Sequence, residues 1–164
     1  TTMVLVPAVV SAVRIPVIAA GGIATGRQMF AAMALGAEGV QMGSRFVASE
    51  EASSHEAFKN AVIHAAEGDT RLSLKALTPV RLLRNRFAEQ VQAAEDRGAT
   101  KDELAALLGR ARAKKGMYEG DLEEGELEIG QVSALVKSVQ PAGDIVAEVW
   151  KDFLATMENP LQKI

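Results

Sequence analysis

Two short apolar runs, separated by one helical segment, most constrain what this chain of 164 residues folds into. The first run, residues 16–20, ends at Gly21-Gly22, and the second begins at residue 39. Residues 26–35 lie between them and carry apolar side chains at helical spacing. A strand–helix–strand unit with so short a crossover requires parallel strands and a right-handed connection. The chain is therefore predicted to have an α/β fold.

The segments around this unit are predicted to be mostly helical. Residues 3–13 are apolar almost all round and precede Pro16, so we expect a buried helix that stops before the proline. Capping-box patterns stand at Ser53-x-x-Glu56 and Thr100-x-x-Glu103. We expect Gly36 to be a left-handed cap, and Gly68, Gly98 and Gly116 to end helices. The expected later helices lie near residues 54–66, 79–97, 101–115, 129–138 and 142–157.

The predicted organisation has three parts. Residues 1–50 hold the two strand–helix units, residues 51–128 a helical extension with an acidic loop, and residues 129–164 closing helices that pack back on the first part. Two parallel strands leave open edges and an uncovered face, so further strands must come from a partner or from chain outside this sequence. The start at Thr1-Thr2-Met3, directly before an apolar run, also suggests a piece of a longer protein.

Composition excludes several classes of protein. The chain has no cysteine and only two histidines, which excludes thiolate metal sites and makes a histidine metal cage improbable. A net charge of −3 and 4% aromatic residues argue against nucleic acid as a partner. No apolar run reaches the roughly 18 residues of a membrane-spanning helix, and no targeting segment stands at the start. We expect no metal, no membrane and a cytoplasmic location.

The two glycine turns are the candidate site. Gly21-Gly22 stands between a predicted strand and a helix, where backbone N–H groups and the helix dipole favour a phosphate. A second turn, Gly43-Ser44, ends the next strand. The spacing matches neither the dinucleotide fingerprint nor the P-loop, but two such turns are typical of the phosphate site of a (β/α)8 barrel. The alternative is that Gly21 and Gly22 only permit a tight turn.

Other polar groups are less informative. His55 and His64 lie nine positions apart, which does not bring them to a shared metal, so we place both at the surface. Residues 119–128 are rich in acidic groups but lack the ligand alternation of a calcium loop, which favours a solvated loop. Arginines 81, 84 and 86 suit an acidic carrier protein or a nucleotide phosphate; the favoured alternative is the polar face of an amphipathic helix.

A family resemblance strengthens the phosphate-site hypothesis. Residues 16–26, Pro-Val-Ile-Ala-Ala-Gly-Gly-Ile-Ala-Thr-Gly, and residues 35–46, Leu-Gly-Ala-Glu-Gly-Val-Gln-Met-Gly-Ser-Arg-Phe, resemble the C-terminal part of the nitronate monooxygenase (2-nitropropane dioxygenase) family. This family includes FMN-dependent enoyl-acyl-carrier-protein reductases of type II. The resemblance extends through residues 54–59, 81–85 and 125–133, which lean towards the enoyl reductase branch.

The resemblance implies the last two strands of a (β/α)8 TIM barrel that carries FMN, followed by a helical extension. Carried over by matching positions, Gly21, Gly22, Gly43 and Ser44 would hold the FMN phosphate; relatives usually have Thr where this chain has Ser44, and the hydroxyl remains. Gln131 matches a position close to the flavin pocket. The family's catalytic histidine lies upstream of the stretch that resembles Thr1-Thr2-Met3, and neither His55 nor His64 matches it. We therefore assign no catalytic residue.

The implied activity is NAD(P)H-dependent reduction of an enoyl thioester, a step of fatty acid biosynthesis, in the complete enzyme. The alternative within the family is oxidation of nitronates by O2. Implied partners are a small-molecule or acyl thioester substrate, acyl carrier protein and a second copy in a homodimer. Two readings lie outside this family: an inactive structural fragment, and another phosphate-binding barrel such as a sugar-phosphate isomerase, which lacks the later matching segments.

Overall fold

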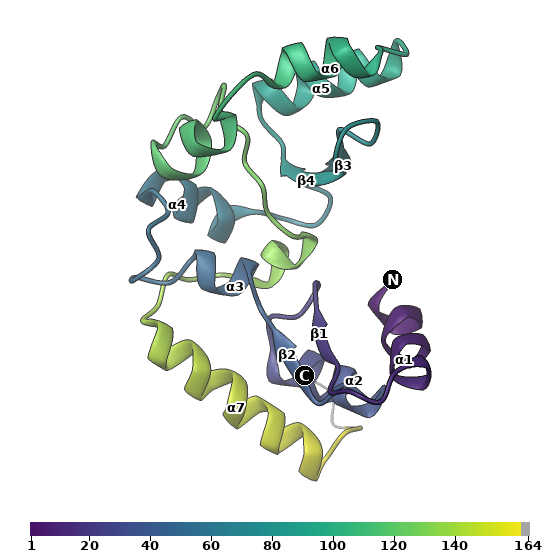
Figure 1. Cartoon of the computed structure of the whole chain (residues 1–164). Helices are drawn as coiled ribbons and strands as arrows, with labels where there is room; N and C mark the ends of the chain where they lie inside the picture. Colours follow the sequence, from purple (N-terminus) through teal and green to yellow (C-terminus); the bar gives the residue numbers. More distant parts are fainter. Residues whose placement is uncertain (162–164) are drawn as a thin grey trace. The chain divides into compact units, whose positions relative to one another are not determined.

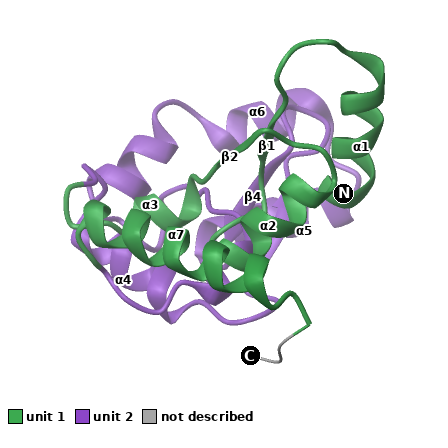
Figure 2. Cartoon of the chain, turned by 90° about the horizontal axis from the view of Figure 1, so that it is seen from below, with its two compact units in different colours: residues 1–51, 140–164 green, residues 52–139 purple. Residues whose placement is uncertain are grey.

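The computed structural model describes residues 1–161. The chain divides into two compact units (Figure 2). Unit 1 is Thr1–Glu51 together with the chain from Gln140 onward, and unit 2 is Ala52–Val139. No helix among residues 1–161 is both long and apolar enough to cross a membrane.

Unit 1 contains the predicted strand–helix–strand unit. Strands β1 and β2 pair in parallel, with Ile18 opposite Gly39 and Ala20 opposite Gln41. Strand β1 starts two residues later than predicted, at Ile18, and ends directly before Gly21 as expected. Strand β2 ends at Gln41, because the chain turns at Gly43 and a short helix begins at Ser44. The elements of unit 1 are α1 (Thr2–Ala12), β1 (Ile18–Ala20), α2 (Gly26–Ala34), β2 (Gly39–Gln41), α3 (Ser44–Val47) and α7 (Ala142–Glu158) (Figure 1).

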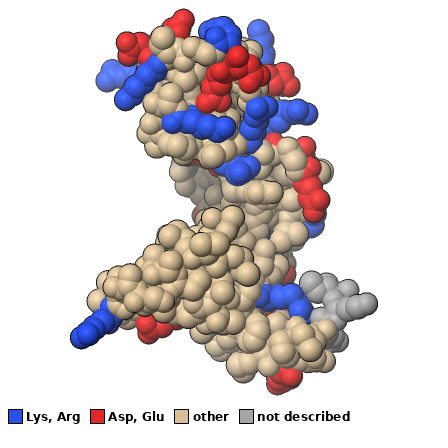
Figure 3. Space-filling model, turned by 90° about the vertical axis from the view of Figure 1, so that its right-hand side faces the viewer, with Lys and Arg blue, Asp and Glu red and all other residues tan. Residues whose placement is uncertain are grey.

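Helix α1 forms where the sequence predicts a helix, but the expectation that it is buried is wrong. Only Val6 is buried, whereas Met3, Val4 and Leu5 are 63–70% exposed. The reason is that the main contacts of α1 are with α2 and β1, which cover only one side of a helix that is apolar all round. The face of unit 1 seen in Figure 3 is correspondingly poor in charged side chains.

The closing helix α7 packs on α2. Its buried residues Ile145, Val149, Phe153 and Thr156 recur at intervals of three or four, the spacing of one helical face. The first residue of α2, Gly26, lies against this face: a Cβ built on Gly26 would lie 2.1 Å from the Phe153 nitrogen and 2.2 Å from the Val149 oxygen. Glycine at this position therefore permits a direct backbone-to-backbone approach of the two helices.

Unit 2 contains a β-hairpin that the sequence analysis missed. Residues 79–97 were expected to form one helix, but β4 (Val80–Leu83) pairs antiparallel with β3 (Thr70–Ser73), and helix α5 (Arg86–Asp96) begins only after Asn85. The remaining elements are α4 (Glu56–His64), α6 (Lys101–Leu108), a π-helical turn η1 (Lys114–Tyr118) and a 3-10 helix η2 (Gln131–Leu135). Leu82, Phe87, Val91 and Leu104 form the core between hairpin and helices.

The helix boundaries were predicted in part. Thr100 and Glu103 form the expected capping box, and Gly36 and Gly98 have positive φ one residue beyond the ends of α2 and α5, after the cap residue. The predicted box at Ser53 is wrong, because His55 caps α4 through its ring nitrogen Nδ1. Gly116 does not end a helix but lies within η1, where it packs against residues 126–127. The predicted helices 101–115 and 129–138 are correspondingly shorter.

Candidate functional site

The two glycine turns leave the same edge of the β1–β2 sheet. Ala20, the last residue of β1, pairs with Gln41, the last residue of β2, and both strands run in the same direction. Gly21-Gly22 follows the first strand directly, and Gly43-Ser44 follows the second after one residue. The carboxyl edge of parallel strands is where ligands bind in α/β folds. The turns that the sequence analysis selected are therefore neighbours in unit 1.

Gly21 and Gly22 have a backbone that other residues rarely adopt. Their φ angles are +93° and +75°, and a Cβ built on either would meet nothing within 4 Å. The hydroxyl of Thr2 donates a hydrogen bond to the Gly21 carbonyl at 3.2 Å, which ties the turn to the start of α1. The turn thus presents exposed backbone with open space where side chains would otherwise stand.

The first turn of α2 is occupied by protein groups. Thr25 Oγ1 accepts from the Gln28 N–H at 3.2 Å, and Asp152 Oδ2 accepts from the Arg27 N–H at 2.8 Å. A carboxylate at this place already complements the positive end of the helix dipole and would repel a second anion. The expectation that the α2 dipole itself holds a phosphate is therefore not supported. The backbone of the preceding glycine turn remains as the candidate anion contact.

The second turn is compatible with a close ligand approach. Gly43 precedes α3 with φ −89° and ψ −63°, an ordinary helical conformation, and a Cβ there would also meet nothing within 4 Å. Its carbonyl accepts from the N–H groups of Phe46 and Val47 at 3.0 Å, which closes the single turn of α3. Ser44, the first residue of α3, is half-buried.

Arg45, which follows this turn, is a charged residue that the sequence analysis did not single out. It is only 6% exposed; its Nη2 donates to Gln140 Oε1 and to Glu148 Oε2, the latter at 3.1 Å, and its Nη1 is buried without an acceptor in the described chain. Arg45 therefore joins α3 to α7 through a buried cation. In the sequence, its position directly after Gly43-Ser44 is the feature that could have marked Arg45 as part of the candidate site.

A small hollow adjoins the first turn. It has a volume of about 210 Å³ and opens between the Gly21-Gly22 backbone, the start of α1 and the inner face of α2. Apart from Thr2 and Gln28, the side chains that line it are apolar. Space for a group of phosphate size therefore exists beside the exposed turn.

The other candidate residues lie in unit 2. Gln131 is the exposed first residue of η2 in unit 2, whereas the glycine turns belong to unit 1. His55 and His64 are both exposed, as expected, and serve α4: His55 caps it, and His64 Nδ1 lies 2.7 Å from the Asn60 carbonyl. Within residues 1–161, no three acidic or histidine side chains gather into a group that could hold a metal ion.

Arginines 81, 84 and 86, which lie close together in the sequence, make different contacts in the structure. Arg81 Nη1 donates to the Thr70 carbonyl at 3.0 Å, and Arg86 pairs with Glu124 at 3.2 Å. Arg84 instead lines a hollow beside α5.

The acidic loop is held by contacts of Asp121. The N–H of Glu124 and then Lys115, whose Nζ lies 3.0 Å away, lower the pKa of this carboxyl.

Comparison with known proteins defines the family. The model of the family "Nitronate monooxygenase" matches residues 1–152, and the chain belongs to this family. A probable nitronate monooxygenase of Staphylococcus aureus (strain MSSA476) is 38% identical over 155 residues, which cover 90% of this chain and 41% of that protein. The family assignment made from the sequence is confirmed.

Solved structures agree with this assignment. The structure of FabK from Thermotoga maritima has 42% sequence identity and a TM-score of 0.91, covering 98% of this chain and 51% of that one. A nitroalkane oxidase from Streptomyces ansochromogenes has 31% identity and a TM-score of 0.76, covering 96% and 44%. The chain thus spans about half the length, or less, of the relatives that it matches.

Proposed function

We propose that this chain is the C-terminal section of an FMN-dependent oxidoreductase and supplies the last two strands of a (β/α)8 barrel. The observation that carries this proposal is the parallel register of Ala20 with Gln41, which brings both glycine turns to one edge of the sheet. Two adjacent turns after the final strands are the usual phosphate site of such barrels. Family membership and the FabK neighbour at 42% identity support the same assignment.

The residues present fit the phosphate end of FMN. Gly21, Gly22 and Gly43 each have open space where a Cβ would stand, so a phosphate can approach their backbone directly. Their N–H groups and the Ser44 hydroxyl would hold the phosphate oxygens. Arg45, whose Nη1 lacks an acceptor among the described residues, adds positive charge beside the second turn. Gln131 is proposed to lie close to the flavin pocket.

The proposed activity is that of an enoyl-acyl-carrier-protein reductase. FMN, when bound, would carry hydride from NAD(P)H to the double bond of an enoyl thioester. The likeness to FabK supports this branch, and the names of the curated relatives support the second candidate, oxidation of nitronates by O2. In either case the described turns bind and orient the cofactor, and the proton-transfer group would come from outside this chain.

The proposed setting follows from this activity. An acyl thioester borne by acyl carrier protein is the proposed substrate, a homodimer the proposed assembly, and the cytoplasm the proposed location. The competing proposal is a structural fragment without activity of its own, because the chain matches only about half of its relatives. A polypeptide that lacks the other strands would then bind no flavin.

Titration of the 164-residue chain with FMN, followed by the quenching of flavin fluorescence, tests cofactor binding. The decisive variant is Gly43→Ala. The backbone of Gly43 is helical and an added methyl group would meet no described protein atom within 4 Å, so alanine fits the fold but occupies the space proposed for the phosphate. Gly143→Ala is the matched control, since it also adds a methyl group into open space, on α7. We expect binding to the parent and to Gly143→Ala, and at least about tenfold weaker binding to Gly43→Ala.

Equal affinity of both variants would contradict the placement of the phosphate at Gly43. A parent chain that binds no FMN would favour the structural-fragment proposal. For a polypeptide that retains FMN, consumption of NAD(P)H with a crotonyl thioester would support reductase activity. Oxygen uptake with a nitroalkane would support the nitronate branch instead.

A further inference from the structure

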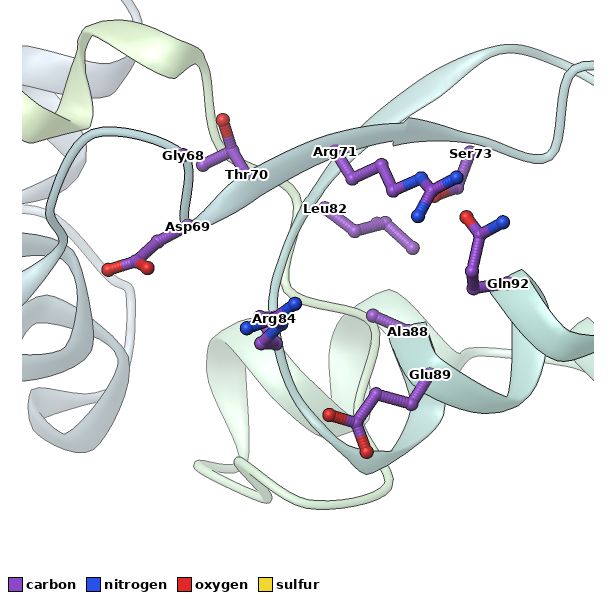
Figure 4. A pocket seen from close by; sticks show the side chains of 10 residues that line it. All are labelled: Gly68, Asp69, Thr70, Arg71, Ser73, Leu82, Arg84, Ala88, Glu89 and Gln92. Carbon is purple, nitrogen blue, oxygen red and sulfur yellow. The ribbon is translucent and has the colours of Figure 1, made fainter.

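Unit 2 contains a second hollow, which is lined mainly by polar side chains. It lies between the β3–β4 hairpin and α5 and plays no part in the proposed FMN site. Its volume is about 220 Å³. Figure 4 shows the side chains that line it. Strand β3 contributes Arg71 and Ser73, Arg84 follows directly after β4, and α5 contributes Glu89 and Gln92. Arg71, Ser73 and Arg84 share the hairpin face on which Leu82 lies, because Arg71 pairs with Leu82 and residues two apart along a strand point the same way.

The guanidinium groups of Arg71 and Arg84 have no hydrogen-bond or ion-pair partner among residues 1–161, unlike those of three other arginines of unit 2. Arg81 donates to the Thr70 carbonyl, and Arg86 pairs with Glu124. Arg112 also pairs with Glu124 and lies over the ring of Phe87. In contrast, no acidic group of residues 1–161 lies within 4.0 Å of the guanidinium groups of Arg71 or Arg84. Two guanidinium groups without an anion beside one hollow, one on β3 and one directly after β4, suit an oxyanion ligand.

Gln92 narrows the chemistry of this ligand. Its Nε2 donates to the Asp96 carboxylate, while its Oε1 is buried and has no donor within the described chain. A ligand that serves both kinds of group must accept hydrogen bonds from guanidinium groups and offer an O–H to Gln92. Phosphate at neutral pH carries both acceptor oxygens and a P–O–H group, whereas sulfate and carboxylate are acceptors alone.

The acidic residues at the hollow do not remove this preference. Asp69 Oδ2 already accepts from the Ala66 N–H at 2.8 Å, and Figure 4 shows its carboxylate pointing away from the other lining side chains. In the same view the Arg71 side chain extends along β3 towards Gln92. Glu89 is exposed on α5, lines the hollow and would weaken anion binding there.

We propose that Arg71, Arg84 and Gln92 form a binding site for a phosphate group, free or as a monoester. Arg71 and Arg84 would bind the anionic oxygens, and Gln92 Oε1 would accept from the remaining P–O–H or from a hydroxyl next to the ester. The hollow is large enough for phosphate and a few attached atoms, so the ester side would extend into solvent. This site belongs to unit 2 alone and does not depend on FMN binding at the glycine turns.

The test is a titration of the 15N-labelled chain with inorganic phosphate, sulfate and ribose 5-phosphate. Amide signals of residues 70–73, 84 and 92 and the Nε–H signals of the arginines report binding residue by residue. We expect saturable shifts at these signals with phosphate in the millimolar range, and weaker binding of sulfate. Tighter binding of ribose 5-phosphate than of phosphate would identify a phosphate ester as the ligand, and equal binding would identify the free ion.

Variants separate this site from general charge effects. Arg71→Gln and Arg84→Gln are each expected to weaken phosphate binding at these signals about tenfold, and Glu89→Gln to strengthen it severalfold. Arg110→Gln removes the same charge from an exposed position of unit 2 and should have little effect. Shifts that are absent, equal for sulfate, or equally weakened by Arg110→Gln would overturn the proposal. Gly43→Ala should leave these signals unchanged, which separates this site from the FMN proposal.

Discussion

The carboxylate of Asp152, in the third turn of α7, accepts a hydrogen bond from the backbone N–H of Arg27 at 2.8 Å. A residue 125 positions away in the sequence thus completes the capping of α2. Thr25 satisfies the Gln28 N–H, so two of the first-turn amides of α2 have protein acceptors. This arrangement stabilises unit 1, and the glycine turn that precedes the helix remains the candidate anion contact.

Replacement of Asp152 by alanine should lower the free energy of unfolding by about 1–2 kcal/mol, because a charge-assisted hydrogen bond at a helix N-terminus is lost. Urea denaturation followed by circular dichroism measures this change. Glu38→Gln, which removes a negative charge from an exposed position of unit 1, serves as the control. FMN affinity should not fall in Asp152→Ala; a fall as large as that for Gly43→Ala would mean that the first turn of α2 does take part in binding.

Gly26→Ala should destabilise unit 1 by about 3 kcal/mol, since the methyl group would overlap the α7 backbone at Phe153 and Val149. The overlap involves main-chain atoms, which cannot rotate away as a side chain can. Thermal denaturation should show a clear loss for this variant. Gly143→Ala should stay within about 1 kcal/mol of the parent, because its methyl group enters open space. Equal stability of the two variants would disprove the close approach of α2 and α7.

Asn85 is expected to contribute about 2–3 kcal/mol to the stability of unit 2. Its Oδ1 caps α5 at the Ala88 N–H, and its Nδ2 donates to the carbonyls of Leu122 and Gly125 at 2.9 and 2.8 Å. Asn85→Ala loses all three bonds, and limited proteolysis should then cut the acidic loop at residues 119–125 more rapidly.

Asn85→Asp separates the two roles of this side chain, because a carboxylate still caps α5 but cannot donate to the two carbonyls. We expect this variant to be destabilised as well, with the same increase in proteolysis of the loop. Unchanged proteolysis in Asn85→Asp would show that the cap alone matters.

Glu126 should make stability depend on pH. Burial raises the pKa of this carboxyl above its ordinary value of 4.5, the nearby Glu128 raises it further, and Arg112 partly opposes both. The folded state therefore binds more protons than the unfolded state, so this group lowers stability as pH rises from about 4.5 through the raised pKa. Glu126→Gln should be more stable than the parent at pH 7, and the difference should disappear near pH 4.5. Denaturation curves at several pH values measure this difference. A difference in free energy of unfolding that is the same at every pH would contradict this assignment.

The part of the fold that could be predicted from the sequence is the part fixed by local signals. The β1–α2–β2 unit follows from apolar runs, glycine turns and helical spacing, and each lies within a few residues. The candidate site was found for the same reason: the turns at Gly21 and Gly43 need only a parallel pairing to become neighbours, and that pairing follows from the short crossover.

The hairpin was missed because the apolar residues of its second strand also fit a helical pattern. Leu82, Leu83 and Phe87 lie at positions that also suit one helical face, and only the pairing of Leu82 with Arg71 makes residues 80–83 a strand. Pro79 and the N-cap residue Asn85 indicate a helix that begins after residue 85, and the prediction of one helix over 79–97 did not take them into account. Arg45 and Asp152 were missed because their roles depend on contacts about 100 positions away, for which the sequence has no short-range pattern.

The discontinuity of unit 1 has a consequence for the order in which the protein folds. A ribosome releases the whole of residues 52–139 before α7 emerges, so the Arg27 amide and the surface around Gly26 stay without their partners during that time. Unit 2 is continuous and can complete its own contacts first, whereas unit 1 must wait for a distant segment to return. Nascent chains arrested before residue 140 should therefore show a protease-resistant unit 2 beside a protease-sensitive β1–α2–β2 segment.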